Sequence, residues 1–323
     1  MEGCVLRGLV ADVGGTNARF ALWEVGRGVT ASRTLPTADF HSPAEAAEAF
    51  LAGVPDGERP TRGAMAVACP VLGDHIELTN ASWSFSIEEV RKALGFETLN
   101  VVNDFAGVAL SLPHLGVDDR RQVGGGTSAR GYPLAVLGPG TGLGVSGIVP
   151  TDYGWVPLSG EGGHVTMAAA NDREAEVLRQ MRAGLGHVSA ERAVSGPGLA
   201  NIAAAIAALA GTDWDPDTSP ADITGRALAG DDPVCVEAVD MMCAFLGTAA
   251  ADICLTLGAR GGVYIAGGIV PRLGAAFDAS PFRRRFETKG RFSTYLAEVP
   301  TYVITHDTPA FIGLGWLLGT GGG

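Results

Sequence analysis

The stretch Leu9–Leu22, LVADVGGTNARFAL, constrains the fold more than any other part of the chain. Alternating apolar residues lead into Gly14-Gly15, and a second apolar run follows, which predicts a β-hairpin. Asp12 precedes the turn and Thr16-Asn17 follow it. Glycines let a ligand approach backbone N–H groups, and a carboxylate beside such a turn suits a metal that accompanies phosphate. The alternative is an ordinary hairpin with an acidic residue at its end.

A second stretch repeats this plan. Pro133–Leu137 and Val145–Val149 predict two strands, and the turn Gly138–Gly144 joins them with the sequence GPGTGLG. Two such hairpins, one in each lobe, indicate an internally duplicated architecture. Gly14-Gly15-Thr16-Asn17 and Gly140-Thr141-Gly142 both offer N–H groups with little side-chain obstruction, so together they predict a polyphosphate site that needs no lysine.

Two common nucleotide-binding motifs are absent from the sequence. The lysines are Lys92 and Lys289, and neither follows the Gly-Lys-Ser/Thr order of a Walker A loop. No GxGxxG follows a strand and opens a helix near the N-terminus, so the common dinucleotide motif is missing too.

Length and charge narrow the class of protein. A chain of 323 residues predicts about two domains. The net charge of −12, from 23 basic and 35 acidic residues, argues against non-specific binding to nucleic acid or anionic membranes. The 5 cysteines are odd in number and form no CxxC, which indicates free thiols in a reducing compartment. We find no signal peptide or membrane span, and we expect a cytoplasmic protein.

Strands and helices alternate in the first lobe, which predicts an α/β layer. The predicted strand Leu99–Val102 runs into Asn103-Asp104, and a helix follows over Phe105–Leu112. Ligands of open α/β sheets bind at the carboxyl ends of strands, where a carboxylate can accept the proton of a substrate hydroxyl during phosphoryl transfer. The alternative is that Asp104 only caps the helix.

Polar residues in the second lobe predict a sugar site. Glu161 and His164 lie in SGEGGH, and Glu191 lies in the helical turn Ser189–Val194. Two carboxylates and an imidazole supply the acceptors and donors that a sugar needs. The alternatives are a metal site, which lacks two ligands at (i, i+4) on one helix, and a structural role for His164.

Gly267-Gly268 follow the predicted strand Gly262–Ala266, GVYIA, and a base or ribose can lie flat against a backbone without side chains. The alternative is a turn at the start of a helix. Farther along the chain we expect a central apolar helix over Val234–Leu257 and a basic surface helix over Phe282–Lys289.

These motifs resemble a known family. LVADVGGTNARFAL, VVNDFAGVAL, LGPGTGLGVS, SGEGGHV, GHVSAERAVSGPGL and GGVYIAGGIVPR together look like the bacterial glucokinases of the hexokinase-like family in the actin-like ATPase superfamily. The resemblance implies an α/β, two-domain, ribonuclease H-like fold with a duplicated βββαβα-type core. It implies a small α/β domain (1–114 plus 306–323), a larger α+β domain (115–305), and an active site in the cleft between them.

The resemblance also assigns roles to residues. Asp104 matches the catalytic base that takes the proton of the glucose 6-hydroxyl. Asn103, Asp104, Glu161, His164 and Glu191 match sugar-binding positions, and Asn80 in LTNASW resembles a sugar-proximal loop. The nucleotide positions are Ala11, Asp12, Val13, Gly14, Gly15, Thr16, Asn17, Gly140, Thr141, Gly142, Gly267 and Gly268. Asp12 is expected near Mg²⁺, through water. Glucose and Mg-ATP are the implied substrates, and the family implies a homodimer.

Two departures and two alternatives accompany the resemblance. Pro139 stands where a small residue is expected in the second turn. The related repressor/sugar-kinase group carries a cysteine-rich zinc motif, but no cysteine lies between Cys69 and Cys235. A kinase for another hexose, such as fructose, mannose or an N-acetylhexosamine, would share the nucleotide motifs. A sugar-sensing regulator is disfavoured by the acidic net charge, by the early first strand and by the presence of Asp104.

Overall fold

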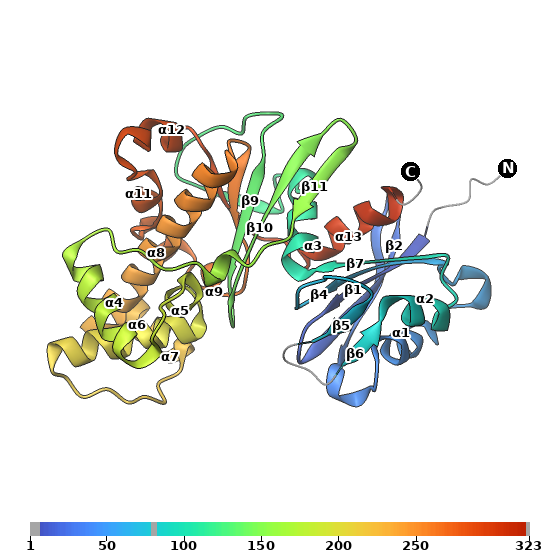
Figure 1. Ribbon diagram of the computed structural model, residues 1–323, viewed down its shortest axis with the longest axis horizontal. Helices are drawn as coiled ribbons and strands as arrows, with labels where there is room; N and C mark the ends of the chain where they lie inside the picture. Colours follow the sequence, from blue (N-terminus) through green and yellow to red (C-terminus); the bar gives the residue numbers. More distant parts are fainter. Residues whose placement is uncertain (1–6, 79–82, 321–323) are drawn as a thin grey trace. The chain divides into compact units, whose positions relative to one another are not determined.

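The computed structural model describes residues 7–78 and 83–320. The chain forms two compact units (Figure 1). Unit 1 comprises Met1–Gly116, Trp155–Ser159 and His306–Gly323, and unit 2 comprises Val117–Gly154 and Gly160–Thr305. The sequence predicted changes of domain after residues 114 and 305. The short segment Trp155–Ser159 was not expected to join the first unit.

Unit 1 is built on a five-stranded sheet with the order β3-β2-β1-β4-β7. The first hairpin pairs β1 with β2 in antiparallel register, and β1, β4 and β7 run parallel to one another. The strands are β1 (Arg7–Val13), β2 (Asn17–Glu24), β3 (Gly28–Pro36), β4 (Arg62–Val67) and β7 (Thr98–Asn103), and a separate small sheet pairs β5 (His75–Glu77) with β6 (Ser84–Ser86). The predicted hairpin is therefore confirmed.

Helices cover both faces of this sheet. The unit contains α1 (Pro43–Leu51), α2 (Ile87–Ala93), α3 (Asp104–Ser111) and α13 (Pro309–Thr320). Ser42 and Ser86 cap α1 and α2, each accepting a hydrogen bond from a backbone N–H in the first turn. Helix α13, from the end of the chain, packs on α3, β1 and β4 (Figure 1).

The alternation of side chains along β1 separates two cores. Leu9, Ala11 and Val13 pack with residues of α1 and α2. Val10 points to the opposite face, where it packs with Leu314 and other apolar residues of α13. Since successive side chains of a strand alternate between faces, Asp12 lies on the same face as Val10. That is also the face on which α13 and its neighbour α3 pack.

The second sheet has the order β11-β10-β9-β12-β13-β8. Its strands belong to unit 2, except for β11, most of which lies in the segment Trp155–Ser159 assigned to unit 1. As in unit 1, an antiparallel hairpin (β9 with β10) is followed by two strands that are parallel to its first strand (β12 and β13). The strands are β8 (Arg120–Val123), β9 (Leu134–Pro139), β10 (Leu143–Thr151), β11 (Gly154–Leu158), β12 (Gly262–Ile265) and β13 (Thr301–Ile304). The turn between β9 and β10 is shorter than Gly138–Gly144, because both strands extend into the predicted turn.

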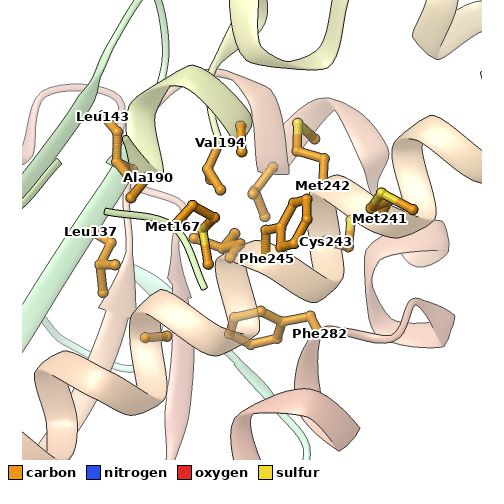
Figure 2. Packing of buried hydrophobic residues seen from close by; sticks show 14 of the residues in the cluster. Leu137, Leu143, Met167, Ala190, Val194, Met241, Met242, Cys243, Phe245 and Phe282 are labelled. Carbon is orange, nitrogen blue, oxygen red and sulfur yellow. The ribbon is translucent and has the colours of Figure 1, made fainter. Parts of the chain in front are cut away.

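The helices of unit 2 surround α8. They are α4 (Asp172–Leu185), α5 (Ala190–Ala193), α6 (Gly196–Ala210), α7 (Pro220–Ala229), α8 (Pro233–Leu257), α9 (Ile269–Leu273), α10 (Ala275–Ala279), α11 (Phe282–Glu287) and α12 (Ser293–Ala297). Helix α8 packs against α6, α7 and α11. Figure 2 shows Met167, Met242 and Phe245 in the apolar cluster that forms the core of this unit.

Helix α8 is long and apolar enough to cross a membrane by length and composition, but 72% of its most apolar window is buried inside the protein. Its hydrophobicity is therefore explained by its central position in unit 2, as the sequence predicted. The expectation of a surface helix over Phe282–Lys289 is wrong in part. Phe282, Arg283 and Phe286 are buried, because α11 packs against α8.

Candidate functional site

The first glycine turn is held by backbone hydrogen bonds. The Gly14 N–H donates to the Asn17 carbonyl oxygen at 2.9 Å, which closes the turn between β1 and β2. Neither Gly14 nor Gly15 has a positive φ, so the turn does not need glycine for its conformation. The space beside Gly14 is open, since a Cβ there would meet only the Asn17 oxygen at 3.4 Å. The Gly14 N–H is thus bonded within the turn, while the missing side chain at Gly14 leaves the turn backbone open to a ligand at this position, as a phosphate site requires.

Thr37 supports this turn from the end of β3. Its hydroxyl donates to the Gly15 carbonyl oxygen at 2.7 Å, and its N–H donates to the Thr16 carbonyl oxygen at 3.0 Å. Thr37 is only 4% exposed. Sequence reasoning missed this residue, because Thr37 lies 22 positions after Gly15 and no local spacing connects them.

The residues of unit 1 that are predicted to bind the nucleotide are partly buried and partly exposed to solvent. The Ala11 and Val13 side chains are buried in the core beside α1 and α2, so only their backbone groups remain for a ligand. The Val13 carbonyl oxygen already accepts a hydrogen bond from the Ala68 N–H at 3.1 Å. Thr16 and Asn17 are exposed at the turn.

Asp12 lies at the carboxyl end of β1, opposite Arg19 of β2. Its Oδ2 is 3.5 Å from Arg19 Nη1, and its side chain keeps 29% of its surface exposed. Burial raises the pKa of the Asp12 carboxyl, and the Arg19 charge only partly opposes this. Among residues 7–78 and 83–320, no group of three or more His, Cys, Asp or Glu side chains could hold a metal by itself. A cation beside Asp12 would therefore depend on water and substrate oxygens.

Asn103 and Asp104 lie where β7 passes into α3. Asn103, not Asp104, is the N-cap of the helix: its Oδ1 accepts hydrogen bonds from the Phe105 and Ala106 N–H groups at 3.0 and 3.3 Å. The Asn103 amide also donates to the Cys69 carbonyl oxygen at 3.3 Å. Asp104 is the first residue of α3, and its Oδ1 accepts from the Phe105 N–H at 2.9 Å. Asn103 therefore makes most of the capping hydrogen bonds that the alternative assigned to Asp104.

Strand register brings these residues of unit 1 to one edge of the sheet. Val13, Val67 and Asn103 are aligned across β1, β4 and β7. Neighbouring strands are about 4.8 Å apart, so the ends of β1 and β7 lie roughly 10 Å apart. Asp12 and the N-terminus of α3 share both this edge and the face covered by α13. The first turn, Asp12, Asn103 and Asp104 therefore form one group.

The second glycine turn consists of residues 140–142. The Gly140 N–H donates to the Gly142 carbonyl oxygen at 2.8 Å, and the Gly196 N–H at the start of α6 donates to the Gly140 carbonyl oxygen at 2.8 Å. Pro139 is the last residue of β9 and is buried. Thr141 is exposed at the tip.

The predicted sugar residues of unit 2 gather around this turn. Glu191, in α5, accepts a hydrogen bond from the Leu143 N–H at 2.9 Å through its Oε2. Helix α5 packs against the 3₁₀ turn Gly162–His164, which in turn packs against β10. Glu161 and His164 are both exposed at the two ends of this turn. His164 is thus not a residue of the core of unit 2.

Gly267-Gly268 follow β12 and lead into α9, so the expected helix-start turn is present. Gly267 has a φ of +79°, and a Cβ there would lie 2.4 Å from the Pro139 carbonyl oxygen. The glycine at 267 is therefore required by its conformation and by its contact with the end of β9. Gly268 faces open space, since nothing lies within 4 Å of a Cβ built there. Asn80 lies outside the described residues.

The sequence matches a family model described as glucokinase over residues 9–320. The chain belongs to the glucokinase family. A glucokinase of Paramagnetospirillum magneticum (strain ATCC 700264 / AMB-1) is 52% identical over 311 residues, which cover 96% of this chain and 97% of that relative. The resemblance seen in the sequence motifs is therefore confirmed at the level of the family.

Solved structures agree with this assignment. The crystal structure of a glucokinase from an Antarctic psychrotroph is similar over 97% of this chain and 99% of that chain, with a TM-score of 0.90 and 38% identity. A ROK family glucokinase from Streptomyces griseus, in complex with glucose and AMPPNP, has a TM-score of 0.64 over 96% of this chain and 98% of that chain. At 18% identity, the second likeness shows the fold alone: a mixed α/β fold shared with ROK sugar kinases.

Proposed function

We propose that this chain transfers the γ-phosphoryl group of ATP to the 6-hydroxyl of D-glucose, giving glucose 6-phosphate and ADP, the first step of glycolysis. Membership of the glucokinase family over residues 9–320 supports an ATP-dependent sugar kinase. The observation that carries the chemical assignment is the placement of Asp104. Its carboxylate begins α3 directly after β7, while Asn103 takes the capping role.

In this proposal Asp104 accepts the proton of the 6-hydroxyl and orients its oxygen for in-line attack on the γ-phosphorus. Asn103, Glu161, His164 and Glu191 bind the sugar hydroxyls. The Streptomyces griseus relative, whose structure contains glucose and AMPPNP, supports glucose and ATP as the pair of substrates.

The two glycine turns bind phosphate oxygens through backbone N–H groups. Residues Ala11–Asn17 supply the first turn and Gly140–Gly142 the second, and Gly267-Gly268 lie against the adenosine. Asp12 fits a water-mediated ligand of Mg²⁺, because its carboxylate is partly exposed beside the first turn. Mg²⁺ bound with ATP neutralises charge on the phosphate oxygens.

The finer fold assignment is also part of the proposal. Both sheets place an antiparallel hairpin beside two strands parallel to the hairpin's first strand. This supports a duplicated, ribonuclease H-like core of the actin-like ATPase type, with a small domain (1–114 plus 306–323) and a larger one (115–305). A homodimer and a cytoplasmic location are proposed from the resemblance.

A hexose panel tests the reaction. The purified chain is assayed with ATP and Mg²⁺ in a coupled ADP-release assay on glucose, fructose, mannose and N-acetylglucosamine. We expect the highest kcat/KM with glucose. A preference for the 2-acetamido sugar would instead support the alternative of another hexose kinase.

Asp104→Asn tests the assignment of the base. The amide cannot accept the proton, so we expect kcat to fall by about 10²- to 10⁴-fold while the glucose Kd changes little. Asp56→Asn is the matched control, because Asp56 is an exposed carboxylate of the same unit. A near-normal kcat for Asp104→Asn would show that another group removes the proton.

A further inference from the structure

Glu191 makes a contact that a sugar ligand does not require. Ser189 caps the short helix α5, and Glu191 is held half-buried in its first turn. From there its Oε2 accepts the Leu143 N–H at 2.9 Å. Leu143 is the first residue of β10, directly after the second glycine turn. A carboxylate of one candidate subsite is thus bonded to the backbone of another.

The segment around Glu191 holds the second turn at both ends. On one side, the Glu191 carboxylate bonds to Leu143; on the other, the Gly196 N–H donates to the Gly140 carbonyl oxygen at 2.8 Å. The two holding points are themselves joined, because the Ser195 hydroxyl donates to the Glu191 carbonyl oxygen at 2.8 Å. Displacing Glu191 would therefore remove one of two supports of this turn.

Gly142 leaves space for this carboxylate. A Cβ at position 142 would lie 2.5 Å from Glu191 Oε2 and 3.3 Å from its Cδ. The φ of Gly142 is not positive, so alanine is compatible with the backbone there. The glycine at 142 is explained by the approach of Glu191 to the turn. Position 142 can therefore be used to move the carboxylate without touching Glu191 itself.

We propose that Glu191 is a positioning residue for the second phosphate-binding turn as well as a sugar ligand, and that it couples the binding of sugar and nucleotide. The inference rests on the proposed function. A carboxylate offers about four acceptor positions on its two oxygens, so the bond to Leu143 leaves capacity for a sugar hydroxyl. A hydroxyl bound to the same carboxylate fixes its position and so orders the turn. Because coupling between two ligands is reciprocal, nucleotide binding strengthens sugar binding by the same factor.

Nucleotide binding in the absence of sugar tests the positioning role directly. AMPPNP with Mg²⁺ is titrated calorimetrically into the wild type, Glu191→Ala, Glu191→Gln and the control Arg192→Ala. Arg192 is the exposed neighbour of Glu191 in α5. We expect Glu191→Ala to weaken binding about tenfold, as loss of one charge-assisted hydrogen bond implies. Glu191→Gln keeps a carbonyl oxygen for the Leu143 N–H, so its Kd should stay within about twofold of the wild type.

The result that overturns the proposal is an AMPPNP Kd of Glu191→Ala equal to that of the wild type. A pure sugar ligand would behave in this way. Equal weakening in Glu191→Ala and Arg192→Ala would also overturn it, because the effect would then belong to α5 as a whole.

A double-mutant cycle with Gly142→Ala tests whether the second turn acts on sugar binding through the Glu191 carboxylate, which the coupling requires. The added methyl group displaces the carboxylate, so we expect the glucose KM to rise about tenfold in the wild-type background. In the Glu191→Ala background the space is empty, and Gly142→Ala should then change the glucose KM by less than about twofold. Equal effects in both backgrounds would overturn the coupling.

This design separates the inference from the proposed function. The AMPPNP titration needs neither sugar nor turnover, so it reports on Glu191 even if glucose is not the acceptor. Absence of phosphorylation of every hexose by the wild type would contradict the proposed function alone.

Discussion

At the scale of single residues, the charge of Asp12 at the sheet edge of unit 1 lowers the stability of the fold. Asp12 is a carboxylate with a pKa raised by burial and only partly lowered by Arg19. An ionised carboxylate that loses part of its hydration on burial costs stability. Its retention at the end of β1 is consistent with a role toward a cation, because the core itself does not require a charge at this position.

The substitution Asp12→Asn is therefore expected to have opposite effects on the stability of the fold and on kinase activity. A raised pKa favours the protonated form in the folded state, so the carboxyl stabilises the fold at low pH, and this stabilisation is lost as pH rises through the folded pKa. We expect Asp12→Asn to raise the Tm at pH 7 and to leave it unchanged near pH 3, where Asp12 is protonated. If Asp12 is the Mg²⁺ ligand proposed above, kinase activity should fall at least about tenfold.

The measurement is thermal unfolding at both pH values, together with the ADP-release assay. A lower Tm at pH 7 would show that Asp12 stabilises the fold through Arg19 rather than opposing it.

Glu174 is a buried carboxylate of unit 2 with the opposite behaviour. Arg285 donates to both of its oxygens, with Nη1 at 3.0 Å from Oε2, and the Ala170 N–H donates to Oε2 at 2.8 Å. Burial alone would raise the pKa of Glu174, but these bonds together hold it below its ordinary value of 4.5. The pair connects α4 to α11 and compensates the charge of Arg285 where the Phe282 and Phe286 side chains draw α11 into the unit.

Arg285→Ala leaves the Glu174 carboxylate buried without its partner, so we expect a loss of about 3 kcal/mol in the free energy of unfolding at pH 7. The lowered pKa means that the pair stabilises the fold above the ordinary pKa and loses this effect as pH falls. The deficit should therefore shrink as pH falls below 4.5 and through the lowered pKa of Glu174. Denaturant unfolding at pH 7 and pH 3 checks this, and a deficit independent of pH would contradict it. Arg284→Ala, which changes an exposed neighbour in α11, is the control.

At the scale of elements, turns carry most of the candidate chemistry, and strands and helices position them. In the turn at Gly267-Gly268, the two positions are occupied by glycine for different reasons. Gly267 needs its positive φ and its approach to Pro139, so it belongs to the packing of β12 beside β9. Gly268 has neither constraint, and its lack of a side chain is explained by the proposed adenosine contact.

Matched alanine variants distinguish these reasons. Gly267→Ala forces a side chain into a left-handed conformation and against the Pro139 oxygen, so we expect a loss of about 1–3 kcal/mol in stability. Gly268→Ala should leave the Tm within about 1 °C of the wild type and raise the KM for ATP without changing the KM for glucose. Thermal unfolding and initial rates at varied ATP measure both. An unchanged ATP KM in Gly268→Ala would remove this position from the adenosine site.

Local elements were largely predictable, and the contacts between them were not. The hairpin at Leu9–Leu22 and the buried helix over Val234–Leu257 follow from patterns within a few residues of each other. The supports of the two turns depend on residues distant in sequence: Thr37 for the first turn, and Glu191 with Gly196 for the second. Such contacts appear only when the fold brings the segments together.

The burial of a helix was also hard to predict where its sequence mixes charged and apolar residues. The sequence FRRRFETK suggests a solvated basic helix, but Phe282 and Phe286 direct α11 into the core of unit 2. Glu174, 111 positions earlier, then neutralises Arg285. A basic helix can thus be buried when a distant carboxylate pairs with one of its arginines.

At the scale of the whole molecule, the first strand, β1, and the last helix, α13, pack together in unit 1. Helix α13 supplies Phe311, Leu314 and Leu318 to the core on one face of the first sheet, where they cover Val10 and Ala64. The unit that carries Asp12 and Asp104 is therefore completed only by the last residues of the chain. Unit 2, in contrast, is formed by one nearly continuous stretch.

Removal of residues 306–323 tests this arrangement. Burying three large apolar side chains contributes roughly 5–9 kcal/mol, which is comparable to the total stability of a typical domain. In the shortened chain we expect hydrogen–deuterium exchange to lose protection in β1 and β4 and to keep it in β9 and β12, with no kinase activity. A chain that ends at Thr320 is the control, because it retains the whole of α13. If β1 and β4 kept native protection without α13, the remaining cluster beside α1 and α2 would be sufficient to fold unit 1, and the loss of activity would have to come from α13 itself.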